Sequence, residues 1–245
     1  MANIINPYRF VGEGPSPSGD YVTISTSGTV NVDSYDSDYK YFVIDSTTSS
    51  AFTVTNAGDS AGSETIEVYL IAGGGGGGGS VAASTVGSGS GGGAGGYLRN
   101  LSYDNDGSLD QVYDVVIGAG GTGWDVSSTT APTAGGDATL TPASSGSVLT
   151  AVGGGHGTYY TGSYNAAGDG GSGGGGGYVT NTTPGSGTTD QGNDGGTGGP
   201  SSPYTWTGGG GAGSVGGGYG GHYSYAEDGG AGGSGKVIIR WKWQN

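Results

Sequence analysis

Apolar and polar residues alternate along several short segments of the chain, which is the pattern of strands with one buried face. The clearest segments are Glu64–Ala72 and Lys236–Trp243, each with apolar residues at every second position. The other predicted strands are Tyr21–Thr26, Thr29–Asp33, Tyr39–Asp45, Phe52–Thr55, Val112–Ile117, Asp137–Thr141 and Val148–Val152. We expect a turn at Ser27-Gly28, between the first two of these strands. No segment has a helical period, so the predicted fold is mostly β and irregular, with a small antiparallel β-region and essentially no α-helix.

Glycine tracts separate these strands and predict a second kind of structure. The longest is Gly73–Gly79, with seven glycines in a row. Others are Gly91–Gly96, Gly153–Gly155, Gly173–Gly177, Gly208–Gly213 and Gly216–Gly221, some with one other residue inside. The pattern divides the chain into an irregular lead (1–19), a β-strand region (20–72) and a glycine-rich domain (73–245) that the C-terminal strand closes.

The conformation expected for the tracts follows from their lack of side chains. Glycine disfavours an α-helix by about 1 kcal/mol per residue. An extended threefold helix with a rise of about 3.1 Å per residue is the alternative, and its N–H and C=O groups must pair sideways with neighbours. Bare backbones can approach one another closely. We therefore predict a bundle of parallel and antiparallel polyglycine-II helices; flexible loops between strands are the alternative.

Composition excludes several classes of protein. Glycine supplies 63 of the 245 residues without a strict Gly-X-Y period, which argues against collagen. The absence of cysteine excludes disulfides and thiolate metal sites. Only six residues are Lys or Arg and the net charge is −14, so nucleic acid is not an expected partner. We expect neither a transmembrane helix nor a signal peptide, because no segment has the required apolar run.

Some short motifs match known sites without the context that those sites need. Gly118–Gly123 fits G-x-G-x-x-G, but dinucleotide binding requires a helix after it, and no helical period follows. Gly170–Gly174 fits G-x-S-x-G and lacks the strand and helix around a nucleophile. The acidic residues of Asp104–Asp110 leave Ca²⁺ binding open, although a turn is the simpler interpretation. We predict no catalytic residue, no metal site and no cofactor, and we do not expect an enzyme.

Aromatic residues are the more informative feature. The chain has 17 Tyr and 4 Trp, and many lie between glycine tracts. In a bundle of bare backbones they should emerge in loops at the ends, and aromatic residues in loops on a rigid scaffold commonly build binding surfaces. Capping the ends of the bundle is the alternative role. The candidate receptor-binding residues are Tyr159, Tyr160, Tyr164, Tyr204, Trp206, Tyr223 and Tyr225.

The order of strands and tracts resembles a known family. The segments are Val68–Gly79 (VYLIAGGGGGGG), Tyr113–Gly123 (YDVVIGAGGTG), Gly135–Leu140 (GGDATL), Val148–Gly155 (VLTAVGGG) and Gly232–Trp241 (GGSGKVIIRW). Together they resemble the glycine-rich domain of bacteriophage tail and virion proteins, over roughly residues 50–243. Ile5–Phe10 (INPYRF) also resembles the N-terminus of marine-phage structural proteins.

The resemblance implies a structural virion protein at a tail fibre or its tip, similar in principle to the polyglycine-II adhesins of T-even phages. Residues 1–19 would then attach the chain to other virion proteins. The candidate aromatic residues would contact a host surface glycan or an outer-membrane protein. We expect a homo-oligomer that is made in the host cytoplasm and located in the virion. The alternatives are a non-adhesive head decoration, cement or fibre-subunit protein, and, less favoured, an ice-binding protein.

Overall fold

The computed structural model describes residues 19–27, 32–34, 37–45, 50–59, 62–80, 89–104, 111–143, 146–161, 163–177, 183–199, 209 and 228–243. Within these residues the chain is all-β: no helix is present, and hence none that could cross a membrane. The strands are β1 (Thr23–Ser27), β2 (Val32–Ser34), β3 (Tyr39–Ile44), β4 (Ser50–Asn56), β5 (Thr65–Ile71), β6 (Tyr97–Asp104), β7 (Gln111–Val116), β8 (Ala138–Pro142), β9 (Leu149–Ala151), β10 (Tyr159–Tyr160), β11 (Tyr164–Asn165) and β12 (Lys236–Lys242).

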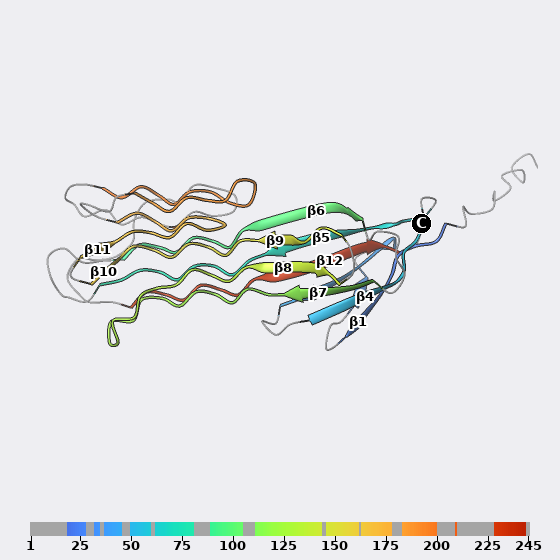
Figure 1. Cartoon of the computed structure of the whole chain (residues 1–245), viewed down its shortest axis with the longest axis horizontal. Coiled ribbons are helices and arrows are strands. Elements are labelled where there is room, and N and C mark those ends of the chain that lie inside the picture. The colour runs from blue at the N-terminus through green and yellow to red at the C-terminus, as the bar shows by residue number, and fades with distance from the viewer. Residues whose placement is uncertain are drawn as a thin grey trace, which may run out of the picture.

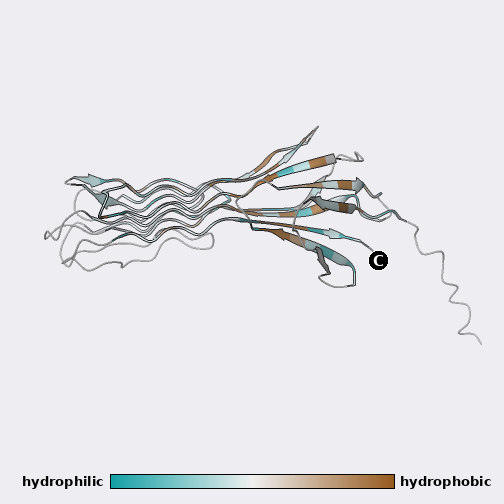
Figure 2. Cartoon of the chain, turned by 90° about the horizontal axis from the view of Figure 1, so that it is seen from below, coloured by the Kyte–Doolittle hydropathy of each residue, from teal (hydrophilic) through white to brown (hydrophobic). Residues whose placement is uncertain are grey.

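Two antiparallel five-stranded sheets form a β-sandwich at one end of an elongated molecule (Figure 1). Their strand orders are β1-β4-β7-β8-β9 and β2-β3-β12-β5-β6. The sheets pack face to face through one hydrophobic core, in which the rings of Phe42 and Phe52 meet edge to face at 5.4 Å. Figure 2 shows the hydrophobic residues concentrated in this part. Both sheets combine strands from residues 20–72 with strands from the glycine-rich part.

The alternating patterns identified most of these strands and their buried faces. In β5 the apolar residues from Ile66 to Leu70 are fully buried, as are Val237 and Ile239 in β12. The C-terminal strand β12 lies in the middle of its sheet, between β3 and β5. Its pattern is regular because one of its faces is buried in the core while the other is not.

The partners of the first two strands differ from the sequence-based expectation. The strands on either side of the predicted turn at Ser27-Gly28 do not pair with each other: β1 pairs with β4, and β2 pairs with β3 in the other sheet. An alternating pattern marks a strand and its buried face, but it does not name the partner. Strand β6 was not predicted, because Arg99 and Asn100 interrupt its pattern and its pairing with β5 contains a register shift.

Six strands of the sandwich continue directly into the glycine-rich bundle (Figure 1). Strands β5, β7 and β9 lead into the segments 72–79, 117–124 and 152–158, and the segments 89–96, 131–137 and 228–235 lead back into β6, β8 and β12. The segment 72–79 lies inside this bundle and hydrogen-bonds to the other five. The sandwich and the bundle are therefore joined by continuous extended chain.

The hydrogen bonds of the segment 72–79 repeat with a step of three residues. Residues 72, 75 and 78 donate to the segment 89–96, residues 73 and 76 to the segment 131–137, and residues 74 and 77 to the segment 228–235. Residues 73, 76 and 79 accept bonds from residues 154, 157 and 160, and residues 74 and 77 accept bonds from residues 121 and 124. A step of three favours a threefold extended helix. Polyglycine-II geometry stays our prediction for these tracts.

Close approach of backbones explains why the tracts are made of glycine. A Cβ atom added at Gly76 would lie 1.8 Å from the carbonyl oxygen of Thr122, and one added at Gly95 would lie 1.9 Å from that of Ala72. Among the described glycines only Gly58 and Gly146 have a positive φ. Most of the described tract glycines are thus required by spacing and not by an unusual backbone conformation.

The glycine motif Gly118–Gly123 lies within one of these tracts. Trp124 follows it, and Asp125 and Thr130 then form an antiparallel bridge around a turn. The helix that a dinucleotide site requires does not follow this motif.

Candidate functional site

Three of the seven candidate receptor-binding residues lie together on a short hairpin. Strands β10 and β11 pair so that Tyr160 faces Tyr164, with ring centroids 4.9 Å apart, while Tyr159 faces Asn165. All three tyrosines are half-buried. The other four candidates lie outside the described residues: Tyr204, Trp206, Tyr223 and Tyr225.

The glycine tract before β10 fixes this hairpin at the end of the bundle. Figure 1 shows β10 and β11 at the end opposite the sandwich. The fixing bonds run from Gly154 N–H to Gly73 O (2.8 Å), from Gly157 N–H to Gly76 O (3.0 Å) and from Tyr160 N–H to Gly79 O (2.9 Å). Because the last bond lies within β10, the register of the bundle continues into the hairpin.

A buried serine–threonine pair reinforces the tract beside the hairpin. Ser90 Oγ accepts a hydrogen bond from Thr158 N–H at 2.8 Å, and the two hydroxyls are also 2.8 Å apart. Ser90 Oγ further donates to the carbonyl oxygen of Gly175. Three separate tracts therefore meet at one buried side chain, directly before Tyr159.

Trp124 supports the hairpin from a different tract, and sequence analysis did not assign it a role at this site. Its ring stacks on that of Tyr159 at 5.5 Å and 25°, and its side chain is only 1% exposed. Trp124 N–H bonds to Gly77 O. The segment 72–79, which we call the central tract, therefore positions both rings. The sequence signal that could have identified Trp124 is its position as a large apolar residue at the end of a glycine tract. The ring of His156 adds an edge-to-face contact with Tyr159 at 5.9 Å.

The turn after Trp124 is held by one carboxylate. Asp125 accepts hydrogen bonds from the hydroxyls of Ser127 (2.7 Å) and Ser128 (2.8 Å) and from their backbone N–H groups. These bonds, led by that of the Ser127 hydroxyl, lower the pKa of Asp125 to about 2. Because these four donors satisfy the carboxylate, its role is to stabilise the turn that follows it.

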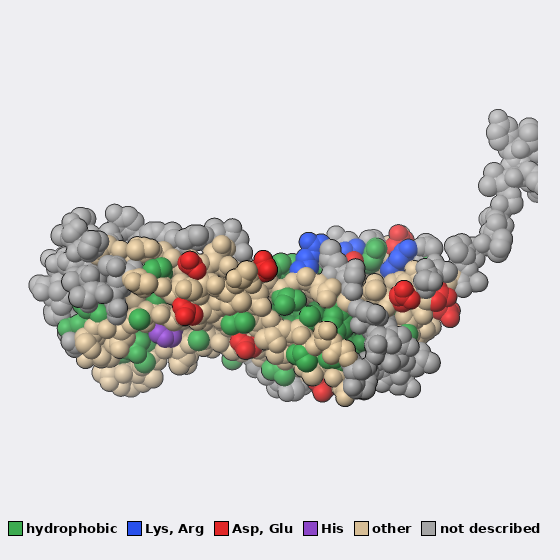
Figure 3. All heavy atoms as spheres, turned by 45° about the horizontal axis from the view of Figure 1, so that its top comes forward, with side chains coloured by type: hydrophobic (Ala, Val, Ile, Leu, Met, Phe, Trp, Pro, Cys, Tyr) green, Lys and Arg blue, Asp and Glu red, His purple; other side chains and the backbone are tan. Residues whose placement is uncertain are grey.

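The chemistry that this end of the molecule offers is non-covalent contact. Aromatic rings and phenol hydroxyls lie on a rigid support, as in protein surfaces that bind glycans or other proteins. No group of three or more His, Cys, Asp or Glu that could hold a metal is found among the described residues. Figure 3 shows acidic side chains on the visible face of the bundle, and residues 100–235 contain no Lys or Arg.

The sequence of the chain matches a known protein family. A family model described as a glycine-rich domain matches residues 47–216, more than two thirds of the chain. The chain belongs to the glycine-rich domain family. The matched residues include the segment 72–79, the hairpin and Trp124, and the resemblance of the chain to a glycine-rich domain is thereby confirmed. No curated protein matches the chain.

Proposed function

We propose that this glycine-rich domain protein is a non-enzymatic structural component of a bacteriophage virion, at a tail fibre or fibre tip, that contacts the host surface with its aromatic hairpin. The observation that carries the proposal is the position of the hairpin. Tyr160 and Tyr164 lie at the far end of the bundle from the sandwich, and backbone bonds from Tyr160 and from the tract before it to the segment 72–79 hold the hairpin there. The resemblance of strand and tract order to phage virion proteins supports the same role.

The bundle suits a part that holds a contact surface away from its attachment. Each tract bonds sideways to its neighbours, so the hairpin is fixed through several segments of the chain at once. In this proposal residues 1–19, of which the structure describes only Gly19, attach the protein to other virion proteins. A host glycan or an outer-membrane protein is the ligand at the opposite end, and the protein acts as a homo-oligomer in the virion.

Binding of the purified protein to candidate host cells tests this role. Tyr160→Ser and Tyr164→Ser are the informative changes, because Tyr159 packs on buried Trp124 and its loss would disturb the bundle. The matched control is Val148→Ser, which changes a residue of the sandwich that is 57% exposed. We expect saturable binding that the double tyrosine variant loses and the control keeps. Equal binding by the two variants would contradict a contact at the hairpin.

A second function is favoured by the burial of Tyr159. Its stacking on Trp124 is what an aromatic cap of the bundle requires, and a cap needs no ligand. The protein would then be a non-adhesive decoration, cement or fibre-subunit protein. In that case no candidate host cell binds the protein, while Tyr159→Ser still lowers its melting temperature.

A further inference from the structure

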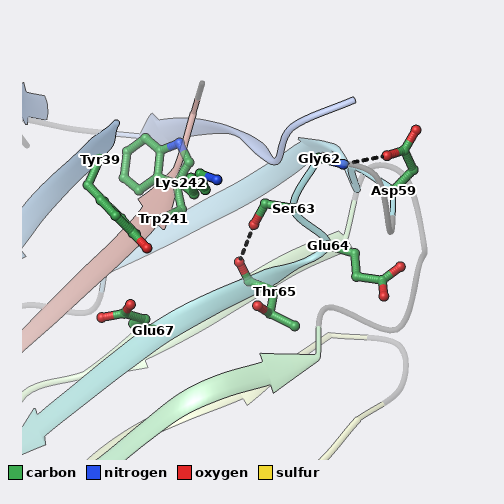
Figure 4. A pocket seen from close by; sticks show the side chains of 9 residues that line it. All are labelled: Tyr39, Asp59, Gly62, Ser63, Glu64, Thr65, Glu67, Trp241 and Lys242. Atoms are coloured by element: carbon green, nitrogen blue, oxygen red, sulfur yellow. Dashed lines mark hydrogen bonds between the residues drawn. The ribbon is translucent and has the colours of Figure 1, made fainter. Parts of the chain in front are cut away.

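A hollow of about 340 Å³ opens on the sandwich, where the ends of β3, β12 and β5 meet the segment before β5 (Figure 4). The side chains that matter for its chemistry are Tyr39, Ser63, Thr65, Glu67 and Lys242; Trp241 also lines the hollow but is buried in the core. The aromatic hairpin lies at the opposite end of the molecule. A hollow of this size is at the small end of the range for ligand pockets, which suits one compact ring-sized ligand.

Glu67 presents one carboxylate oxygen that its neighbours do not use. Tyr69 O–H donates to Glu67 Oε2 at 2.8 Å, and Arg240 Nη1 donates to the same oxygen at 3.3 Å. Within the described part of the chain Glu67 Oε1 has no hydrogen-bond partner, and the side chain is 19% exposed. Burial raises the pKa of Tyr69, and the bond to Glu67 raises it further, so the phenol stays protonated as the donor. The carboxylate is therefore held firmly with one acceptor still available.

Tyr39 places a hydroxyl beside this carboxylate. The guanidinium of Arg240 lies over the Tyr39 ring at 3.9 Å and thereby fixes the ring next to Glu67. Figure 4 shows the Tyr39 hydroxyl directed toward Glu67. Arg240 thus orients both side chains, one through its charge and one through its flat face.

The charges around the hollow favour a neutral ligand. Arg240 compensates the charge of Glu67, and Lys242 adds an ammonium group to the lining. The carboxylates of Asp59 and Glu64 point away from Tyr39 and Glu67 (Figure 4). Hydroxyl, ammonium and carboxylate groups beside the Tyr39 ring can both donate to and accept from the hydroxyls of a sugar.

We infer that this hollow binds a single monosaccharide unit, with Glu67 Oε1 and the Tyr39 hydroxyl bonding to its hydroxyl groups. The site goes beyond the contact proposed for the hairpin and does not depend on it. Sugar binding here would persist in a protein that attaches to no cell, and cell attachment through the hairpin would persist in a protein that binds no free sugar.

Ligand-observed NMR on the full chain tests the inference, with glucose, galactose, mannose and N-acetylglucosamine as the probes. We expect saturable binding of at least one sugar at millimolar affinity. Glu67→Gln should weaken it about tenfold, because it removes a charged acceptor, and Tyr39→Phe should weaken it several-fold. Tyr41→Phe is the matched control: Tyr41 lies two residues along β3, does not line the hollow, and should leave binding unchanged.

Three outcomes would overturn the inference. Absence of saturable binding by all four sugars is the first. Binding that Glu67→Gln and Tyr39→Phe both leave unchanged, while circular dichroism shows that the variants are folded, would place the sugar elsewhere. Tighter binding of a simple diamine such as cadaverine than of any sugar would show that the hollow selects cations.

Discussion

At the scale of single residues, the glycines of the bundle differ sharply in what surrounds them. A Cβ atom at Gly232 would lie 2.0 Å from the carbonyl oxygen of Gly74, whereas one at Gly230 would meet nothing within 4 Å. Both glycines belong to the same tract, and neither has a positive φ. The two positions therefore separate the effect of close packing from that of composition.

We predict that Gly232→Ala lowers the free energy of unfolding by about 2–3 kcal/mol, because the added methyl group forces two backbones apart. Gly230→Ala should leave stability unchanged or raise it by about 0.5 kcal/mol, since alanine restricts the unfolded chain. Denaturant unfolding followed by circular dichroism measures both. Equal losses in the two variants would mean that the tracts are not packed at the observed spacing.

A second residue-scale prediction concerns the turn at Asp125. Its pKa in the folded protein, about 2, lies below the ordinary value of a free aspartate. The stabilisation by its hydrogen bonds is therefore fully present above about pH 4 and is lost as the pH falls through about 2. A carboxyl-carbon NMR titration of Asp125 should give this low midpoint, and Ser127→Ala should raise it. A midpoint near 4 in the unaltered protein would contradict the hydrogen-bonded turn.

At the scale of elements, buried hydroxyls link tracts that share few other side-chain contacts. Ser90 joins three tracts through its bonds to Thr158 and Gly175. Ser172 is also fully buried, but its hydroxyl has no hydrogen-bond partner among the described residues. Comparison of Ser90 with Ser172 tests how much one hydrogen-bonded side chain contributes to holding the tracts together.

We predict that Ser90→Ala destabilises the protein by about 1–3 kcal/mol, because it leaves the buried Thr158 N–H without its acceptor. Ser172→Ala is the control and should change stability by less than about 0.5 kcal/mol, or stabilise the protein, since it removes a buried group that forms no bond. Thermal melts of both variants check this. A loss of stability in Ser172→Ala that is larger than about 0.5 kcal/mol would show that the Ser172 hydroxyl forms a hydrogen bond.

The elements also show how far sequence reasoning reached. The regular alternation in β5 and β12 was sufficient to identify the strands and their buried faces. The partner of β1 was not predictable from its own pattern, and neither was β6, whose polar residues hide it. Three candidate tyrosines lie together because the hairpin pairs them, and Trp124 joins them only through a neighbouring tract.

At the scale of the whole molecule, the described basic residues are confined to the sandwich, whereas acidic residues occur on both the sandwich and the bundle. All the Lys and Arg residues that the structure describes lie on one sheet of the sandwich, on β3, β6 and β12: Lys40, Arg99, Lys236, Arg240 and Lys242. The visible face of the bundle carries acidic groups (Figure 3). Like charge on the bundles of neighbouring copies disfavours unspecific association between them.

We predict that the bundle and the sandwich unfold together. Six strands run into tracts without a linker, so separation of the tracts removes the support for the strand ends. In a thermal series of NMR spectra, the glycine amides of residues 73–79 and the methyl groups of Val68 and Ile239 should lose intensity at the same temperature. Two separate midpoints would show that the bundle is an independent unit.

The sequence by itself determined which segments are strands and which are glycine tracts, because an alternating pattern and the absence of side chains are local properties. It also indicated that aromatic residues gather between the tracts. Only the tertiary structure decided which strands pair, which tracts lie next to one another, and that Trp124 supports Tyr159. The hollow at Tyr39 and Glu67 likewise requires strands that are far apart in the chain. Glycine tracts are nearly identical to one another in sequence, so their order is set by the strands to which they are joined and by close backbone contacts.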